Sequence, residues 1–303
     1  MSSPTIGQRT APPQAYASLL IAVLAVSMGA IFIRLSQEQG IPSPLIAAAR
    51  LVFAALILTP FALRRHWTEV QSLGRGTWVL IGASGVLLAI HFAAWIASLE
   101  YVSVLISVAL VNTGPLWAAI LEFLVLGTRP KRLVMIGLLI GISGSVVAAV
   151  AAANAPGANP VLGSLLALIG ALGLAGYWVI GRKVRSSLPL LPYLWLVYGS
   201  AALTMLVVVL VNRTPVTGYP SIGYLWLMVT AAVPQLIGHS AFNFALRYFP
   251  ASYVGIVGQS ETLLSAIAAY LVFRQVPLSG ELLGSAIIIG GVLLATIGQA
   301  QNK

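Results

Sequence analysis

Long apolar stretches recur along the chain, separated by short segments rich in Pro, Gly or charged residues. About 20 apolar residues in a helix cross the roughly 30 Å hydrocarbon core of a bilayer, so each stretch predicts a membrane-spanning helix. The stretches are apolar on all sides, whereas the strands of a membrane β-barrel alternate in polarity over about ten residues. The pattern predicts ten helical spans, at residues 15–35, 44–63, 77–98, 102–126, 132–152, 162–181, 190–211, 222–245, 251–272 and 280–299.

The composition excludes a soluble fold. Of the 303 residues, 59% are hydrophobic and 7% are charged, whereas a soluble domain carries about 25% charged residues. The 16 Lys and Arg residues are spread between apolar stretches, which suits a lipid bilayer better than the concentrated basic face of a nucleic-acid binder. Cys and Asp do not occur, which removes disulfides, thiolate metal sites and Asp-rich diphosphate motifs. We therefore expect no nucleic-acid partner, no metal and no cofactor.

Positive charge is divided unequally between the two ends of the predicted spans. An alternating topology places twelve Lys and Arg residues on the side that holds both termini, and four on the other: Arg34, Arg50, Arg213 and Arg274. Short cytoplasmic loops carry an excess of Lys and Arg. We therefore predict a multi-pass protein of the bacterial inner (plasma) membrane with both termini in the cytoplasm.

An internal repeat divides the spans into two sets of five. At an offset of 147 residues, residues 101–146 align without gaps with residues 248–293, and the loop residue Pro130 falls on Pro277. Because five is odd, the second set begins on the opposite face of the membrane, which predicts the inverted-topology repeats found in secondary transporters. The expected organisation is a cytoplasmic tail, a first five-helix repeat, a linker, a second five-helix repeat and a tail, at residues 1–14, 15–152, 153–161, 162–299 and 300–303.

Several short motifs also resemble a known family. They are Ala49-Arg50-Leu51, Asn112-Thr113-Gly114-Pro115-Leu116, Gln259-Ser260-Glu261-Thr262-Leu263, and the Pro130 and Pro277 loops that each precede a Gly-rich span. Their order and spacing resemble the drug/metabolite transporter superfamily, in particular its ten-helix exporters built from two EamA-type repeats. The resemblance covers nearly the whole chain, is nearest to YddG-type (aromatic) amino acid exporters, and implies export of small metabolites. The chain departs from the family pattern at Thr262, where the family often has Pro, and lacks the acidic residue that commonly follows the fourth and ninth spans.

Glu261 is the acidic residue deepest in a predicted span. Ionisable side chains inside a membrane are costly unless they face protein or a watery cavity. Glu261 is a candidate to bind a substrate ammonium group or to carry a proton, since burial favours the neutral carboxyl form. The alternatives are a neutral acid hydrogen-bonded between helices, or an ion pair with Arg50 or Arg34.

Polar and aromatic side chains recur on one face of the third span, at Ser84, Leu88, His91, Trp95 and Ser98. Spacings of three and four residues place them on one side of a helix. We interpret this face as the lining of a cavity, and the alternative is a hydrogen-bonded seam between helices.

The eighth span carries a second polar series, in which Gln235, His239 and Asn243 are spaced by four residues. Pro234 predicts a kink, because proline leaves a backbone carbonyl without its donor. That carbonyl is expected either to serve as a ligand or to be satisfied by Gln235.

The fourth and ninth spans place their polar stretches, residues 112–115 and 259–262, at equivalent positions of the repeat. Irregular backbone at membrane depth is tolerated where it lines a cavity or is buried in protein. Both stretches are expected to meet at a midplane substrate site with aromatic walls. The candidate cavity residues are His91, Trp95, Asn112, Trp117, Tyr177, Trp178, Gln235, His239, Asn243, Gln259 and Glu261.

Small residues recur at helical spacing on the fifth span, at Gly137 and Gly141, and on the tenth, at Ala286 and Gly290. Such pairs let two helices approach closely. They predict either a helix contact within the chain or the face of a homodimer.

The leading hypothesis is a secondary transporter that exports small organic metabolites, above all amino acids including aromatic ones, by alternating access around a midplane cavity between the two repeats. A drug or cation (multidrug) efflux transporter of the same fold is the alternative. A different class, an intramembrane serine hydrolase, would use Ser260 and either His91 or His239, although Thr262 stands where a nucleophile elbow needs Gly. The chain has no nucleotide-binding Walker sequence, which argues against an ATP-driven pump.

Overall fold

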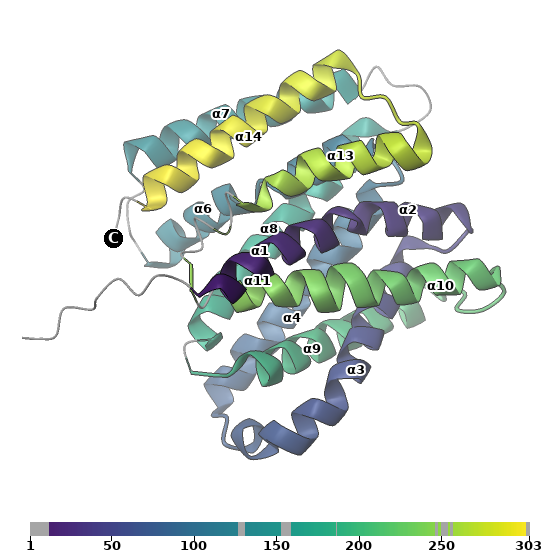
Figure 1. The fold of residues 1–303 in the computed structure, drawn as a ribbon, viewed down its shortest axis with the longest axis vertical. Helices are drawn as coiled ribbons and strands as arrows, with labels where there is room; N and C mark the ends of the chain where they lie inside the picture. The colour runs from purple at the N-terminus through teal and green to yellow at the C-terminus, as the bar shows by residue number, and fades with distance from the viewer. Residues whose placement is uncertain are drawn as a thin grey trace, which may run out of the picture.

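The computed structural model describes residues 12–126, 131–152, 159–185, 187–245, 248–249, 254 and 257–300, which form helices and connecting turns without a strand (Figure 1). Most of the predicted tails 1–14 and 300–303 and of the linker 153–161 lies outside these residues. The helices are α1 (Pro13–Ser27), α2 (Gly29–Glu38), α3 (Ser43–Gln71), α4 (Arg75–Ser98), α5 (Val104–Val111), α6 (Gly114–Leu126), α7 (Arg132–Ala152), α8 (Pro160–Arg185), α9 (Leu190–Val211), α10 (Ser221–Thr230), the π-helix η1 (Ala231–His239), α11 (Ser240–Ala245), α13 (Ser260–Phe273) and α14 (Ser279–Ala300).

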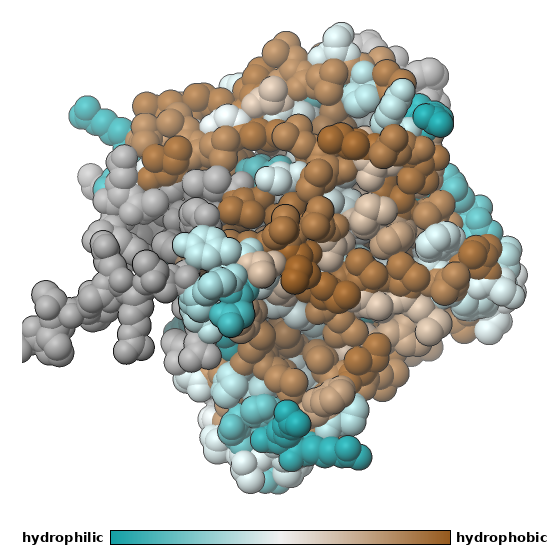
Figure 2. Space-filling view, viewed as in Figure 1, coloured by the Kyte–Doolittle hydropathy of each residue, from teal (hydrophilic) through white to brown (hydrophobic). Residues whose placement is uncertain are grey.

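The outside of the helix bundle is apolar. In the described part of the chain, seven helical stretches are long and apolar enough to cross a membrane, and three shorter apolar helices lie in α7, α13 and α14. Figure 2 shows hydrophobic residues spread over one broad face, with hydrophilic residues gathered toward its margins. Apolar side chains are exposed on this bundle, and Val211 at the end of α9 is 75% exposed, which is unfavourable in water and favourable in lipid. The chain is an all-helical multi-pass membrane protein, as the sequence predicts.

Several predicted spans are interrupted helices. The first span divides at Met28, between α1 and α2. The fourth divides at Asn112 and Thr113, where α5 ends and α6 begins with Gly114 and Pro115. Proline has no N–H to donate and is favoured in the first turn of a helix, so Pro115 fits a new start better than a continuing helix. The irregular backbone predicted for this segment is confirmed.

Helix α3 is longer than its predicted span at residues 44–63, because it continues to Gln71. Its last two turns are polar, and His66 contacts Glu69 through Nδ1 and Oε2 at 2.7 Å. The apolar pattern ends where the hydrocarbon ends, whereas a helix continues until its backbone is capped or broken.

Helices α7 and α14 pack side by side along their lengths (Figure 1). A Cβ atom added to Gly291 would lie 2.5 Å from the backbone nitrogen of Gly141, and one added to Gly137 would lie 2.5 Å from that of Ala295. Only glycine permits this backbone contact. The small residues of the fifth span therefore serve a contact within the chain. On α14 the predicted pair is wrong for this contact, because Ala286 and Gly290 are both exposed and point away from α7.

Candidate functional site

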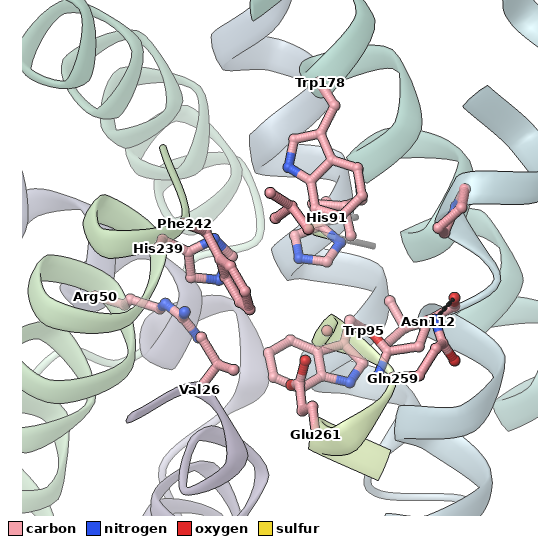
Figure 3. A pocket seen from close by; sticks show the side chains of 15 residues that line it. Val26, Arg50, His91, Trp95, Asn112, Trp178, His239, Phe242, Gln259 and Glu261 are labelled. Atoms are coloured by element: carbon pink, nitrogen blue, oxygen red, sulfur yellow. Dashed lines mark hydrogen bonds between the residues drawn. The ribbon is translucent and has the colours of Figure 1, made fainter. Parts of the chain in front are cut away.

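A cavity of about 50 Å³ lies between the helices, large enough for a few water molecules, and six of its fifteen lining residues are polar or charged. Helices α1, α3, α4, α5, α6, α8, η1, α11 and α13 contribute to its lining. The cavity brings together seven of the eleven predicted residues, several of which point toward one another in Figure 3: His91, Trp95, Asn112, Trp178, His239, Gln259 and Glu261.

The two histidines lie on helices that meet across the cavity. The His91 and His239 ring centroids are 6.5 Å apart. His91 Nδ1 donates to the backbone carbonyl oxygen of Gly170 at 2.9 Å, which in the neutral ring leaves Nε2 as an acceptor. Trp95 stacks on His91, with 5.8 Å between the ring centroids. Helices α4 and α8 approach closely here, because Gly173 has no side chain. A Cβ atom added to Gly173 would lie 2.9 Å from the backbone nitrogen of His91.

The polar stretches of the fourth and ninth spans meet directly. Gln259 Nε2 donates to the backbone carbonyl oxygen of Asn112 at 3.1 Å. In return, Asn112 Nδ2 donates to Thr262 Oγ1, also at 3.1 Å. The helix break at Asn112 exposes the carbonyl that Gln259 binds, so the interruption of the fourth span and the contact with the ninth have one cause.

Arg50 is a cavity residue, whereas the charge distribution predicts it on the side of the membrane opposite the termini. That prediction is wrong for Arg50, because α3 begins at Ser43 and Arg50 lies about two turns inside it, with 1% of its surface exposed. Removing it leaves three charges on that side: Arg34, Arg213 and Arg274. A signal was present, because Arg50 is a single charge within the apolar run of residues 44–58.

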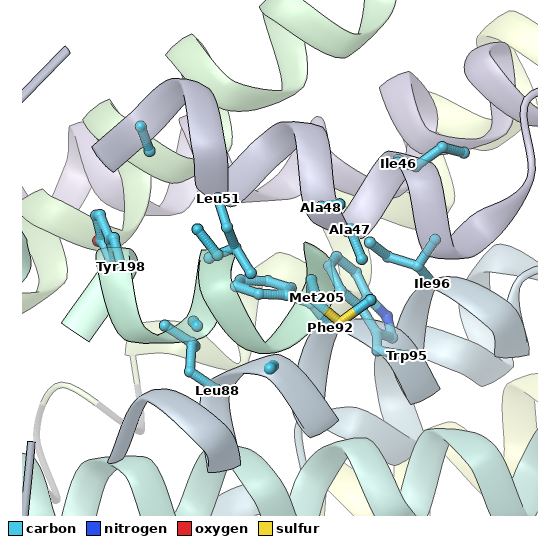
Figure 4. Packing of buried hydrophobic residues seen from close by; sticks show 14 of the residues in the cluster. Ile46, Ala47, Ala48, Leu51, Leu88, Phe92, Trp95, Ile96, Tyr198 and Met205 are labelled. Carbon is cyan, nitrogen blue, oxygen red and sulfur yellow. The ribbon is translucent and has the colours of Figure 1, made fainter. Parts of the chain in front are cut away.

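Three contacts fix the Arg50 side chain. Its Nε donates to Gln235 Oε1 at 2.6 Å. Its Cζ atom lies 3.9 Å from the ring centroid of Phe92 and 5.8 Å from that of Trp95, which are cation–π distances. Phe92 and Trp95 belong to the main apolar core, where they pack with Leu51 between α3, α4 and α9 (Figure 4). The core therefore holds the guanidinium plane at the cavity wall.

Glu261 lies in the first turn of α13 and lines the same cavity as Arg50. The predicted ion pair of Glu261 with Arg50 or Arg34 is not formed. Arg34 instead donates to the backbone carbonyl oxygens of Leu99 and Val102, at 3.0 and 2.8 Å. Glu261 has no ion pair within 4.0 Å with either arginine. A positive and a negative side chain thus share the cavity without neutralising each other by contact.

Four predicted residues do not line the cavity. Gln235 lies behind it, where it binds Arg50. Asn243 Nδ2 donates to the Tyr177 hydroxyl at 3.1 Å and to the His239 carbonyl oxygen at 2.7 Å, so Asn243 and Tyr177 form a link between helices. Trp117 lines a separate, apolar cavity of about 320 Å³ between α6, α7 and α8. These side chains resemble the cavity residues in polarity. Only the packing of the helices shows which of them line the cavity.

Pro234 lies in the π-helix η1, within an otherwise continuous run from α10 to α11. A π-helix adds a residue to the turn, which accommodates a proline that cannot donate to the preceding turn. The prediction that Gln235 satisfies a freed carbonyl is not confirmed, since Gln235 Nε2 has no hydrogen-bond partner.

The remaining lining is apolar. Pro115 belongs to the polar stretch expected at the site, and the sequence does not predict the others: Val26, Val111, Leu174, Phe242, Val254 and Gly258. Such residues are indistinguishable in sequence from those that face lipid.

Ser260, the nucleophile of the hydrolase alternative, is exposed on α13 and does not line the cavity that contains both histidines. Among the described residues, Ser260 is therefore not placed in the cavity beside either candidate base.

The sequence profile of the EamA-like transporter family matches the chain twice, at residues 14–150 and 161–297. The chain belongs to the EamA-like transporter family. Each match covers one of the two sets of spans, and both supply cavity residues. As an EamA-like protein, it is a membrane transporter, which agrees with the coarse form of the sequence hypothesis.

Two relatives carry the name uncharacterized transporter. One, from Archaeoglobus fulgidus, is 24% identical over 283 residues, covering 92% of this chain and 96% of the relative. The other, from Synechocystis, is 19% identical over 238 residues, covering 75% of this chain and 70% of the relative. A crystal structure with a TM-score of 0.62 and 19% identity covers 93% of this EamA-like chain and 97% of its own, and shows that the two share a fold.

Proposed function

We propose that this protein is a secondary transporter that exports small organic metabolites, chiefly amino acids including aromatic ones, by alternating access. One observation carries the proposal: both matched segments contribute polar side chains to one cavity inside an apolar helix bundle. His91 and Asn112 come from the first segment, and His239, Gln259 and Glu261 come from the second. A site between two repeats is where transporters of inverted topology bind substrate.

The helix contacts support two inverted five-helix repeats, at residues 15–152 and 162–299. Within ten spans, α7 packs along α14 and α3 along α9, which are contacts between equivalent spans. The contact of α4 with α8 has its counterpart in the contact of α1 with η1. A two-fold axis between the halves would map the contact of α4 with α8 onto the contact of α1 with η1. It would map the α7–α14 and α3–α9 contacts onto themselves. Both termini then lie on one side, the cytoplasmic side of the bacterial inner membrane.

The cavity chemistry favours amino acids over the multidrug alternative. Trp95, Trp178 and Phe242 offer apolar and aromatic surface, and Glu261 offers a negative charge, which a cationic drug would also find favourable. Arg50 lies in the same cavity and repels a substrate that carries only positive charge. An aromatic amino acid matches all three features, in accord with the resemblance to YddG-type exporters.

A homodimer would place the outward-facing Ala286 and Gly290 of α14 against a second copy, because these small residues have no neighbour of their own to accommodate. Chemical cross-linking in membranes tests this arrangement. A cross-linked dimer that disappears when Gly290 is replaced by Leu supports it, and a monomer in native membranes contradicts it.

The decisive experiment is a flux assay with purified protein in liposomes, using amino acids, cationic drugs and nucleosides with and without a pH gradient. We expect saturable movement of amino acids, and flux that persists in Ser260→Ala, as a transporter without a serine nucleophile requires. Absence of flux across the whole panel, or flux of the cationic drugs alone, contradicts the proposal. If amino acids move and the pH gradient has no influence on their flux, the proton-carrying role of Glu261 fails while its substrate-binding role survives.

A further inference from the structure

Arg50 lines the cavity, and its guanidinium carries an unused donor. Its Nε is occupied by Gln235, and its plane rests on Phe92. Its Nη1 is buried and has no hydrogen-bond partner. Buried polar groups are normally paired, and a native group left unpaired calls for an explanation. A guanidinium pairs best with a carboxylate, which accepts two parallel hydrogen bonds.

Two other lining side chains have buried atoms without partners. Trp95 Nε1 is a free donor, and its ring lies 5.8 Å from Arg50 Cζ. Gln259 Oε1 is a free acceptor, while the Nε2 of the same amide is held by Asn112. The unused donors of Arg50 and Trp95 suit an anionic group. The unused acceptor of Gln259 is two residues from the carboxylate of Glu261 and suits a cationic one.

The two charged side chains of the cavity also lack a partner of opposite charge in contact with them. Arg50 on α3 and Glu261 on α13 both line the cavity, and no contact within 4.0 Å joins them. Arg50 is buried and Glu261 is partly buried, so each is stabilised by an opposite charge placed in contact with it. A ligand that carries a positive and a negative group close together would pair with both side chains at once. It would also offer hydrogen-bond partners to the unpaired atoms beside them.

We infer that Arg50, supported by Gln235, binds the carboxylate of the substrate and that Glu261 binds its ammonium group, so that the cavity selects zwitterionic α-amino acids. This inference rests on the proposed transport function. Binding sites built to pair a polar group discriminate strongly against analogues that lack it, because the protein group is then left buried and unpaired. The site therefore rejects an amine without a carboxylate and an acid without an ammonium group.

The test compares three compounds with one side chain: phenylalanine, phenethylamine and 3-phenylpropionate. Their uptake into proteoliposomes is measured for the wild type, Arg50→Gln, Arg50→Lys and Glu261→Gln. We expect the wild type to prefer phenylalanine at least tenfold over both analogues. Arg50→Gln should lose that preference over the amine, Glu261→Gln should lose it over the acid, and Arg50→Lys should retain part of the preference because the positive charge remains.

Two further variants separate recognition from folding. Arg64→Gln removes an exposed arginine from the same helix and should leave uptake unchanged. Gln235→Leu keeps Arg50 but frees its Nε, so it should raise KM for phenylalanine while the amine is still rejected. Thermal unfolding in detergent identifies any variant that fails to fold. Should Arg50→Gln be one of these, the comparison of Arg50→Lys and Gln235→Leu with the wild type decides.

The outcomes distinguish the two levels of the hypothesis. If the wild type moves none of the three compounds and no other amino acid, the transport proposal fails. If the wild type transports phenylalanine but Arg50→Gln and Gln235→Leu retain its KM and its selectivity, transport stands and the role of Arg50 is overturned. Equal uptake of all three compounds by the wild type also overturns the inference.

Discussion

The side chain of Gln259 donates to the backbone carbonyl oxygen of Asn112 at 3.1 Å, across a sequence separation of 147 residues. That separation equals the offset of the internal repeat, so the bond joins two equivalent positions of the two halves. Each lies where a helix is interrupted: α5 ends before Asn112, and α13 begins after Gln259. The halves therefore touch where both are irregular, beside the cavity.

Replacing Gln259 by Ala removes this bond and leaves the Asn112 carbonyl without its donor. A net hydrogen bond contributes about 1 kcal/mol, so stability in detergent should fall by about that amount. The flux per folded protein should also fall, because the bond positions the cavity wall as well as stabilising the fold. The exposed Gln71, replaced by Ala in the same way, is the matched control. Equal effects of the two substitutions on flux would contradict the prediction.

Trp95 and Trp117 form a second matched pair. Trp95 lines the polar cavity, and Trp117 lines the separate apolar one. Trp95→Phe keeps an aromatic ring but removes the free Nε1 donor, so KM for the transported amino acid should rise about fivefold, as expected for one lost hydrogen bond. Trp117→Phe should leave KM unchanged, because its Nε1 donates to Thr113 Oγ1, in the break just before its own helix. A reversed order of the two effects would place the substrate in the apolar cavity.

Neighbouring glycines of α14 should respond in opposite ways to alanine. In Gly291→Ala the new Cβ atom would meet the backbone of Gly141 and Gly137 at 2.5 and 2.7 Å, and overpacking of this kind costs about 1–3 kcal/mol. In Gly290→Ala the new atom meets nothing within 4 Å, and the helix gains from the higher helix propensity of alanine over glycine. Thermal unfolding should show a lower midpoint for the first variant and an unchanged or higher one for the second. Similar midpoints would show that α7 and α14 are not in backbone contact.

The absence of cysteine makes the orientation directly measurable. Ser72 lies in the exposed turn after α3, and Thr217 lies in the exposed loop between α9 and α10. With ten spans and cytoplasmic termini, a membrane-impermeant thiol reagent added to intact cells should label Thr217→Cys but not Ser72→Cys. Opening the cells should expose both positions. Labelling of Ser72→Cys alone in intact cells would reverse the topology.

The sequence was most informative where polarity contrasts with an apolar background. His91, Asn112, His239, Gln259 and Glu261 stood out for that reason, and all five line the cavity. The repeat added the expectation that the polar stretches of two distant spans meet.

The same contrast misled in two ways. It could not separate a polar residue that lines a cavity from one that links two helices, as in the pair Tyr177 and Asn243. It also assigned Arg50 to the membrane surface, because charge near a predicted boundary is normally a topology signal. The side to which a helical side chain points depends on packing against helices distant in sequence, which a linear pattern does not specify.

The contact of α7 with α14 also constrains how the protein is made. Helix α7 is complete at Ala152, yet its partner begins at Ser279, near the end of the chain. During synthesis, the glycine-lined side of α7 must remain without its partner while the intervening helices enter the bilayer. The first five-helix unit thus cannot reach its final packing on its own, and α14 completes both halves together once it has been synthesised.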